Sequence, residues 1–245
     1  MMNPCIVIPT CNNGTTLPDM LARMAPLGYP IIIVDDGSSA PSATAVKAAA
    51  DRWDNVQLLV RATNGGKGAA VMDGIEAAFE RGFSHALQID GDNQHRVEDI
   101  PLFLEAARQH PSALVLGSPV FPPDTPKARL IGRRISIVWV AIETLSRSIA
   151  DPLFGLRVYP VAITREVIRR ARPGRRMDFD PEIAVRLYWE GLDVVNIPAP
   201  VTYHEGGVSS FRMLRDNVRI SWMHTRLFIG MIGRIWKLLL RRRSK

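Results

Sequence analysis

Four apolar segments in the first ninety residues each end in a loop of polar or glycine residues, and this pattern constrains the fold more than any other feature. The segments cover residues 5–8, 31–34, 56–60 and 85–90. Apolar residues recur at helical spacing between them, at 17–24, 42–53 and 69–79. Alternating strands and helices predict βαβ units, so we expect an α/β fold with a mostly parallel sheet and helices on both faces.

The loops after these strands are predicted to face one crevice. Right-handed crossover connections place the carboxyl ends of parallel strands on the same edge of a sheet. Open α/β sheets bind their ligands at that edge. The loops concerned are residues 9–13, 35–36, 64–68 and 90–94. We therefore expect a single binding site assembled from four loops.

Asp90 and Asp92 stand one residue apart after the fourth apolar segment, and Gln94 follows them. Two carboxylates at this edge are the hard oxygen ligands that Mg²⁺ or Mn²⁺ prefers, and such an ion can hold a diphosphate. The alternative is a solvated turn, because Asp, Gly and Asn are ordinary turn residues. The three other loops directed at the same crevice favour the metal site.

Composition limits the class of protein and its partners. The chain has 245 residues, 47% of them hydrophobic, which predicts one large domain with a sizeable core. A formal net charge of +7 is compatible with three kinds of binding partner: nucleic acid, an anionic membrane surface or phosphorylated substrates. Cys5 and Cys11 lack metal-binding spacing and favour a reducing compartment. We expect no signal peptide before the first strand and no membrane span, because every apolar run falls short of ~18 residues.

The second half of the chain is less regular. Its expected elements are a strand at 113–117, a proline-rich loop at 119–126, a helix at 129–149, a turn and strand at 151–159, a helix at 177–191 and an extended segment at 193–203. We place a domain boundary at residue 210. A domain over 1–210 is then followed by a basic, amphipathic helical tail over 211–245.

The tail has the pattern of a helix that lies in a membrane interface. Projected as one helix, its cationic residues share one arc, namely Arg215, Arg219, Arg226, Arg234, Lys237 and Arg241. Apolar residues fill most of the remaining surface, and three arginines at 241–243 favour anionic lipid. Because the positive charge accompanies tryptophans and aliphatic residues, lipid is favoured over nucleic acid. The alternative is packing on the domain or on a second subunit, so a homo-oligomer stays open.

Five motifs, in this order, resemble those of the family 2 glycosyltransferases with the GT-A fold. The resemblance is closest to the branch of dolichyl- and polyprenyl-phosphate sugar transferases. The motifs are Ile8-Pro9-Thr10 with Asn12, Val34 to Ser38, Asn64 to Ala69, Asp90 to His95 and Asp151 to Arg157. They cover roughly residues 5 to 160, and they imply a Rossmann-like GT-A sheet.

The resemblance implies a metal-dependent, inverting transfer of a sugar from a UDP- or GDP-sugar to a polyprenyl phosphate or another membrane-associated acceptor. It assigns donor binding to Pro9, Thr10, Asn12, Asp35, Asp36, Lys67, Asp90 and Gly91. It assigns Mg²⁺ or Mn²⁺ binding to Asp90, Asp92 and Gln94, and a catalytic role to Asp92. Lys67 is followed by Gly68, so its loop is not an ATPase phosphate loop. Direct contact and an orienting role both stay open for Lys67.

Asp151 matches the acidic residue that is the family's candidate general base, although it could also be a turn carboxylate before Pro152. Arg157 could contact phosphate or orient Asp151. Pro119 stands where the family commonly has an arginine, which shifts phosphate binding to the arginines at 129, 133 and 134. Arg133, Arg134, Arg157 and Arg212 are therefore the predicted phosphate and acceptor residues.

Two other functions were weighed against this one. A sugar-phosphate nucleotidyltransferase would carry a glycine-rich, basic loop after the first strand, which residues 9–14 lack. A non-catalytic module that binds nucleotide sugar or membrane would not need Asp90, Asp92 and Gln94. We therefore expect a peripheral enzyme on the cytoplasmic, inner face of the membrane.

Overall fold

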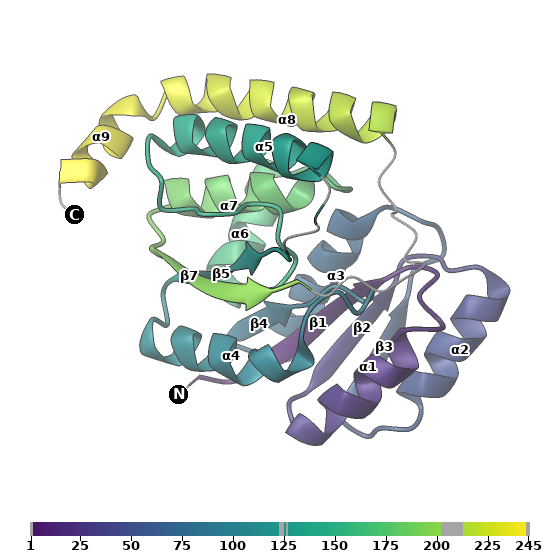
Figure 1. Cartoon of the computed structure of the whole chain (residues 1–245). Coiled ribbons are helices and arrows are strands. Elements are labelled where there is room, and N and C mark those ends of the chain that lie inside the picture. The colour runs from purple at the N-terminus through teal and green to yellow at the C-terminus, as the bar shows by residue number, and fades with distance from the viewer. Residues whose placement is uncertain (1, 123–124, 126, 202–212, 244–245) are drawn as a thin grey trace.

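The computed structural model describes residues 2–122, 125, 127–201 and 213–243. Its centre is a seven-stranded sheet with the strand order β3-β2-β1-β4-β6-β5-β7 (Figure 1). The strands are β1 (Pro4–Thr10), β2 (Ile31–Asp35), β3 (Val56–Val60), β4 (His85–Gln88), β5 (Leu114–Val120), β6 (Arg157–Pro160) and β7 (Val194–Pro200). Strands β1 to β4 pair in parallel, and so do β5 and β7, whereas β6 pairs antiparallel with β4 and β5.

Helices cover both faces of this sheet. They are α1 (Leu17–Met24), α2 (Ala40–Ala50), α3 (Lys67–Glu80), α4 (Ile100–Gln109), α5 (Lys127–Thr144), α6 (Val161–Ala171), α7 (Phe179–Trp189), α8 (Met213–Ile232) and α9 (Ile235–Arg243), with 3-10 turns at Ala25–Leu27 and Val97–Asp99. The predicted α/β fold with a mostly parallel sheet is confirmed. The sequence analysis assigned no helix to α4 or α6.

The two faces have separate cores because side chains alternate along each strand. Ile6 and Ile8 of β1 lie in a cluster with α1, α2 and α4. Cys5 and Val7 lie in a second cluster with α3, α6 and α7. Gly74 of α3 lies so close to β1 that an added Cβ would sit 2.3 Å from Val7 Cγ1, so glycine allows this helix to approach the sheet. These cores fix the loop edge on which the site is built.

The C-terminal segment differs from the single helix that was projected from the sequence. Helix α8 ends at Ile232, and Gly233 and Arg234 separate it from α9. Met223, Leu227 and Met231 of α8 are buried in the same core cluster as α3, α6 and α7. Helices α5, α7 and α8 pack against one another, as Figure 1 shows. The proposed boundary at residue 210 stays a prediction.

Part of the predicted cationic arc lies against the protein. Arg226 pairs with buried Glu182, with Nη2 2.9 Å from Oε2. The guanidinium groups of Arg234 and Arg241 stack on the rings of Trp189 and Tyr188. Three of the six cations of this arc therefore face the protein, as the alternative of packing on the domain predicts for them.

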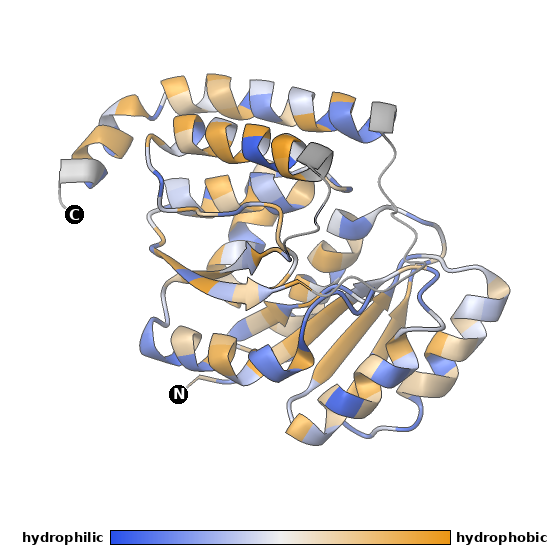
Figure 2. Cartoon of the chain, viewed as in Figure 1, coloured by the Kyte–Doolittle hydropathy of each residue, from blue (hydrophilic) through white to orange (hydrophobic). Residues whose placement is uncertain are grey.

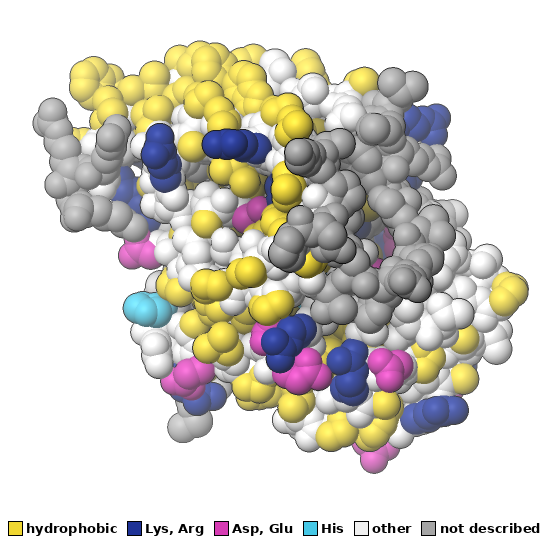
Figure 3. Space-filling view, viewed as in Figure 1, with side chains coloured by type: hydrophobic (Ala, Val, Ile, Leu, Met, Phe, Trp, Pro, Cys, Tyr) yellow, Lys and Arg dark blue, Asp and Glu magenta, His cyan; other side chains and the backbone are white. Residues whose placement is uncertain are grey.

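The outward side of α5, α8 and α9 is apolar instead, as Figures 2 and 3 show. We call this surface the outer apolar face; its exposed members are Leu130, Ile131, Ile135, Val138, Trp139, Ile142, Val218, Trp222, Phe228, Ile229, Ile232, Trp236, Leu239 and Leu240. Trp222 is 62% exposed and Trp236 is 80% exposed. Within the described residues, every helix is too short or too polar to cross a bilayer.

Candidate active site

The reversed direction of β6 brings the second half of the chain to the loop edge. Arg157, at the start of β6, lies opposite Gln88, at the end of β4. The turn at 151–156 therefore reaches the same edge as Asp90. A Cβ at Gly155 would sit 2.0 Å from Asp90 Oδ2, so a glycine is required where this turn passes Asp90. The motifs around Asp90 and Asp151 thus meet in space.

One carboxylate oxygen of Asp90 accepts a hydrogen bond, and the other accepts none from the described residues. Its Oδ2 accepts from Lys67 Nζ at 2.8 Å, and His95 Nε2 lies 3.6 Å from the same atom. Its Oδ1 is buried and accepts no hydrogen bond from the described residues. Burial alone would raise the pKa of Asp90, but the charge of Lys67 and the neighbouring His95 outweigh it and hold the pKa well below its usual range.

Asp92 lies beside this carboxylate in a different environment. Its Oδ1 accepts from the backbone N–H of Gln94 at 3.1 Å. Burial and the negative charge of Asp90 raise the pKa of Asp92. Two carboxylates this close together favour the binding of a positive charge beside them.

Asp90 and Asp92 fit a divalent cation that they would coordinate together with a bound phosphate ligand. The described residues contain no group of three or more His, Cys, Asp or Glu side chains that could hold a metal alone. The orphan Oδ1 of Asp90 and the carboxylate of Asp92 supply two oxygens. Mg²⁺ is commonly held in this way, by one or two carboxylates with substrate phosphates and water. Gln94 stays a proposed third contact.

The first two loops are joined by hydrogen bonds. Asp35 is 1% exposed, and its Oδ1 accepts from the backbone N–H and the hydroxyl of Ser38 at 3.1 and 2.5 Å. Asn12 Oδ1 accepts from the backbone N–H of Ser39 at 2.8 Å, and the Asn12 N–H donates to Ser38 Oγ. A Cβ added at Gly91 would lie 3.0 Å from Thr10 Oγ1, so Gly91 lies close to the end of β1. The predicted donor residues Pro9, Thr10, Asn12 and Asp35 thus belong to one wall.

Asp36 holds the glycine loop in place. Its carboxylate oxygens accept from the backbone N–H groups of Gly65 and Gly66 at 2.8 and 2.7 Å, and Arg61 Nε lies 2.9 Å from Oδ1. The side chain of Asp36 is nearly inaccessible. Because both of its oxygens are engaged by these groups, a direct nucleotide contact by this carboxylate does not fit, and Asp36 instead supports the glycine loop.

Lys67 begins α3 directly after that loop. Its ammonium donates to Asp90 Oδ2 and, at 2.6 Å, to Asp180 Oδ2 at the start of α7. Although burial disfavours the charged ammonium, Asp180 and Asp90 outweigh it and raise the pKa of Lys67 above its usual range. Asp180 was not among the predicted site residues, because nothing near it in the chain indicates that it meets Lys67.

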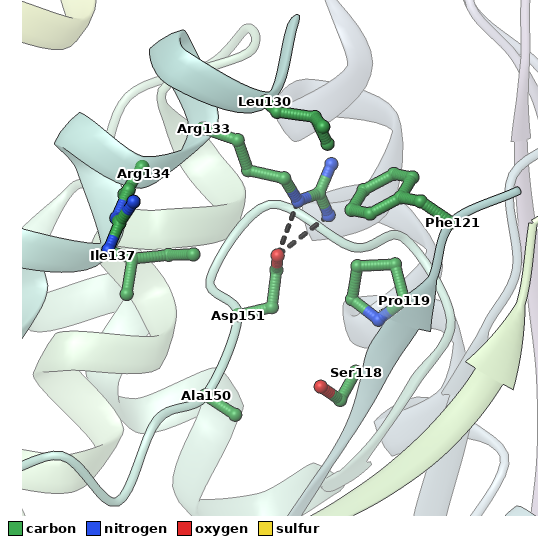
Figure 4. Close-up of a pocket in the computed structure, with 9 residues that line it drawn as sticks. All are labelled: Ser118, Pro119, Phe121, Leu130, Arg133, Arg134, Ile137, Ala150 and Asp151. Carbon is green, nitrogen blue, oxygen red and sulfur yellow. Dashed lines mark hydrogen bonds and ion pairs between the residues drawn. The ribbon is translucent and has the colours of Figure 1, made fainter. Parts of the chain in front are cut away.

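A separate cavity of about 250 Å³ lies on the other side of this edge (Figure 4). It is lined by Ser118, Pro119, Phe121, Leu130, Arg133, Arg134, Ile137, Ala150 and Asp151. Arg133 Nη2 donates to Asp151 Oδ1 at 2.7 Å, and Arg133 Nε donates to Oδ2. Two predicted arginines therefore line the same cavity as Pro119, where the family's common arginine is missing.

Asp151 is held tightly in this cavity. It is 3% exposed, and besides Arg133 it accepts from the backbone N–H of Leu153 at 2.8 Å. Both of its oxygens are thus engaged. A carboxylate paired in this way is well placed to orient Arg133, and it could act as a base only after that pair opens.

Arg157 lies behind the cavity and is fully buried. Its guanidinium donates to the carbonyl oxygens of Phe154, Pro152 and Asp180 at 2.6 to 3.1 Å. The predicted phosphate contact does not fit this position, because these carbonyls already engage the side chain. Arg157 instead fixes the turn that follows Asp151. Arg212, the remaining predicted phosphate residue, lies outside the described residues.

Comparison with known protein families decides what class of enzyme carries this geometry. Residues 5–168 match the family model described as Glycosyl transferase family 2. The chain belongs to this family. The match covers the four loops, the Asp90–Asp92 pair and the turn at 151–157. The protein is therefore a glycosyltransferase, and the alternative of a non-catalytic module is set aside.

Curated relatives of this glycosyltransferase fall in the branch that its motifs resemble. Polyprenol monophosphomannose synthase of Mycolicibacterium smegmatis is 28% identical over 87% of this chain and 82% of its own length. Undecaprenyl-phosphate mannosyltransferase of Micrococcus luteus is 27% identical over 85% of this chain and 87% of its own length. Dolichyl-phosphate beta-glucosyltransferase of Dictyostelium discoideum is 28% identical over 95% and 76%.

Solved structures agree on the fold of this glycosyltransferase. Glucosyl-3-phosphoglycerate synthase from Mycobacterium tuberculosis, in complex with Mn²⁺ and UDP-glucose, superposes with a TM-score of 0.69. It is 15% identical and covers 95% of this chain and 79% of its own. TarS of S. aureus with UDP-GlcNAc superposes with a TM-score of 0.61 at 15% identity, and the match covers 99% of this chain and 73% of TarS. At such identity the similarity establishes the GT-A fold alone.

Proposed function

We propose that this glycosyltransferase transfers a sugar from a nucleotide-sugar donor to a polyprenyl phosphate at a membrane surface. The observation that carries the proposal is the cavity of Arg133 and Asp151, which combines guanidinium groups with apolar walls. Such a lining suits a phosphate at the end of an apolar chain. The curated relatives support the same acceptor, because their names refer to polyprenol monophosphomannose, undecaprenyl phosphate and dolichyl phosphate.

The donor occupies the other side of the edge. We assign nucleoside binding to the wall of Pro9, Thr10, Asn12 and Asp35, and diphosphate binding to Asp90, Gly91 and Asp92. Mg²⁺ or Mn²⁺ held by Asp90, Asp92 and Gln94 would neutralise the diphosphate leaving group. The glucosyl-3-phosphoglycerate synthase complex with Mn²⁺ and UDP-glucose, which shares this fold, supports a divalent metal.

The transfer is an inverting displacement. A phosphate oxygen of the acceptor forms a bond to the anomeric carbon while the bond from that carbon to the diphosphate breaks, and the nucleoside diphosphate leaves with the electron pair. Arg133 and Arg134 bind the acceptor phosphate, and Asp151 orients Arg133. An acceptor phosphate is already ionised near neutral pH, because its second pKa is about 6. The attack therefore needs no proton removal by Asp151.

The outer apolar face places the acceptor cavity at the membrane. Leu130 and Ile137 of α5 line the cavity, and Leu130 also belongs to this face. Large exposed apolar patches mark sites of contact with membranes or other proteins. We infer that α5, α8 and α9, and with them the segment 215–245, lie on the cytoplasmic, inner leaflet. A second copy of the chain on this face is the competing explanation.

The proposal is tested by the melting temperature of the protein with UDP or GDP, each with and without Mn²⁺. One diphosphate is expected to raise the melting temperature, and only when Mn²⁺ is present, because a ligand stabilises the state that it binds. No response to either diphosphate would contradict the donor assignment. Release of pyrophosphate from a sugar 1-phosphate and UTP or GTP would favour the nucleotidyltransferase instead.

A further inference from the structure

Lys67 connects the donor site to a carboxylate that comes from the far half of the chain. Its ammonium lies 2.8 Å from Asp90 Oδ2 and 2.6 Å from Asp180 Oδ2. Asp180 stands in the first turn of α7 and is 5% exposed. One positive charge is therefore shared by two carboxylates, of which Asp90 belongs to the predicted metal site.

Asp180 is itself fixed by buried groups. Gln88 Nε2 donates to Asp180 Oδ1 at 3.2 Å, and Gln88 Oε1 accepts from the hydroxyl of Tyr159 at 2.9 Å. Arg157 Nη1 donates to the backbone carbonyl of Asp180 at 2.9 Å. Gln88, Tyr159 and Arg157 are all fully buried. The Asp180 carboxylate thus has one set position, with Gln88 on one oxygen and Lys67 on the other.

This arrangement leaves Asp90 charged and held from one side. Lys67 engages Asp90 Oδ2, whereas Oδ1 has no partner among the described residues. Without the negative charge of Asp180, the ammonium would neutralise Asp90 alone and would be free to move towards Oδ1. Asp180 therefore determines both where Lys67 sits and how much negative charge Asp90 keeps.

We propose that Asp180 is a positioning residue of the donor site, which acts through Lys67 to hold Asp90 ready for a divalent cation and a diphosphate. This inference rests on the proposed function. Carboxylates that hold the ligands of a metal without touching it change metal affinity when they are replaced, typically by about 10- to 100-fold. We therefore expect Asp180 to control cation affinity from outside the coordination shell.

The test is the Mn²⁺ dissociation constant of the full chain in the presence of UDP or GDP, measured by titration calorimetry. Asp180→Asn is expected to weaken Mn²⁺ binding about tenfold or more. The matched control is Asp178→Asn, in which a buried carboxylate just before α7 is replaced. Asp178 Oδ1 accepts from the backbone N–H of Arg176 at 3.0 Å, and no contact joins it to Lys67 among the described residues. The control is expected to lower the melting temperature and leave Mn²⁺ binding unchanged.

A double-mutant cycle separates an effect through Lys67 from a general structural effect. In a Lys67→Gln background, Asp180→Asn is expected to add little to the loss of Mn²⁺ affinity, because coupled residues are not additive. If Asp180→Asn does not fold, Gln88→Met takes its place, because it releases Asp180 Oδ1 with little change in volume. A smaller loss of Mn²⁺ affinity is then expected, again absent in the Lys67→Gln background.

The outcomes distinguish this inference from the proposed function. If the wild-type chain binds no Mn²⁺ with either diphosphate, the metal–diphosphate site fails and the role of Asp180 fails with it. If the wild-type chain binds Mn²⁺ and Asp180→Asn or Gln88→Met binds it equally well, only the role of Asp180 is overturned. Additive effects in the cycle would also overturn it.

Discussion

The donor side and the acceptor side of the edge are built in different ways. On the donor side, short loops are tied to one another by buried hydrogen bonds, such as those of Asp36 to Gly65 and Gly66. On the acceptor side, a single arginine of α5 reaches Asp151 across a cavity, below an exposed apolar surface. The donor side has its parts fixed before a ligand binds. The acceptor side joins an arginine to an exposed apolar surface, which we propose faces lipid.

The largest loss of sugar transfer is expected from a substitution on the donor side. Asp92→Ala is expected to raise the activation free energy of sugar transfer by several kcal/mol, because a metal contact to the leaving group is lost. The rate of transfer should therefore fall about a thousandfold. The protein should stay folded by circular dichroism and should still float with liposomes. Wild-type transfer by this variant in the presence of metal would show that Asp92 is not part of the site.

Arg133→Gln is expected to affect the acceptor side alone. Hydrogen bonds to charged groups contribute about 1.5–3 kcal/mol, so kcat/KM for polyprenyl phosphate should fall about ten- to hundredfold. Binding of UDP or GDP with Mn²⁺ should not change. Arg108→Gln on α4, where Arg108 is exposed and pairs with Glu105, is the control. An equal loss of diphosphate binding would mean that the two sides are not separate.

Replacement of two members of the outer apolar face tests its contact with lipid. Ile135→Glu combined with Trp222→Glu should lower liposome flotation about tenfold or more, because each side chain contributes about 1.5–3 kcal/mol when it is buried. Leu102→Glu on α4 is the matched control, since Leu102 is 54% exposed on another part of the surface. If the pair changed the oligomeric state and not the flotation, a second copy of the chain would cover this face.

Gly155→Ala tests where the two sides meet. Its new Cβ would clash with the Asp90 carboxylate, so the variant should lose about 1–3 kcal/mol of stability, as overpacked sites do. Chemical denaturation measures this loss, and Mn²⁺ binding should weaken with it. Gly132→Ala is the control, because nothing lies within 4 Å of a Cβ at Gly132. Stability equal to that of the wild type would mean that the turn and Asp90 are not in contact.

The smallest effect concerns the packing of α5 on α8. Burial raises the pKa of Glu143, whose Oε1 lies 2.8 Å from His224 Nδ1. A raised pKa means that the folded state favours the protonated form, so this group destabilises the fold as pH rises through its pKa. Glu143→Gln should therefore gain melting temperature relative to the wild type at pH 8 but not at pH 4. The exposed Glu105→Gln is expected to show no such pH dependence, and an equal gain for both would refute the burial argument.

The donor side was predictable because its signals are local. Asp35, Asp90 and the glycine loop each follow an apolar strand, and the parallel sheet then brings them together. Helix α4 carried a readable signal in Ile100, Phe103, Leu104 and Ala107, which recur at helical spacing but were not used.

Contacts between distant parts of the chain were not predictable. The pairing of Lys67 with Asp180, the burial of Arg157 and the reversal of β6 each depend on how the two halves pack. The turn of Arg226, Arg234 and Arg241 towards the protein depends on their partners in α7, which a helical projection cannot represent. The sequence therefore predicts which residues lie at the loop edge of the sheet better than it predicts the buried residues that contact them.

Metal-dependent transfer of a sugar to a polyprenyl phosphate can be assayed on the full chain. The protein is incubated with UDP- or GDP-linked hexoses and a polyprenyl phosphate in detergent, and the glycosylated lipid is detected by mass spectrometry. We expect a glycosyl polyprenyl phosphate that disappears when EDTA removes the metal and returns when Mn²⁺ is added. Absence of this product with every donor, or its undiminished formation in EDTA, would show that the protein does not catalyse this metal-dependent transfer.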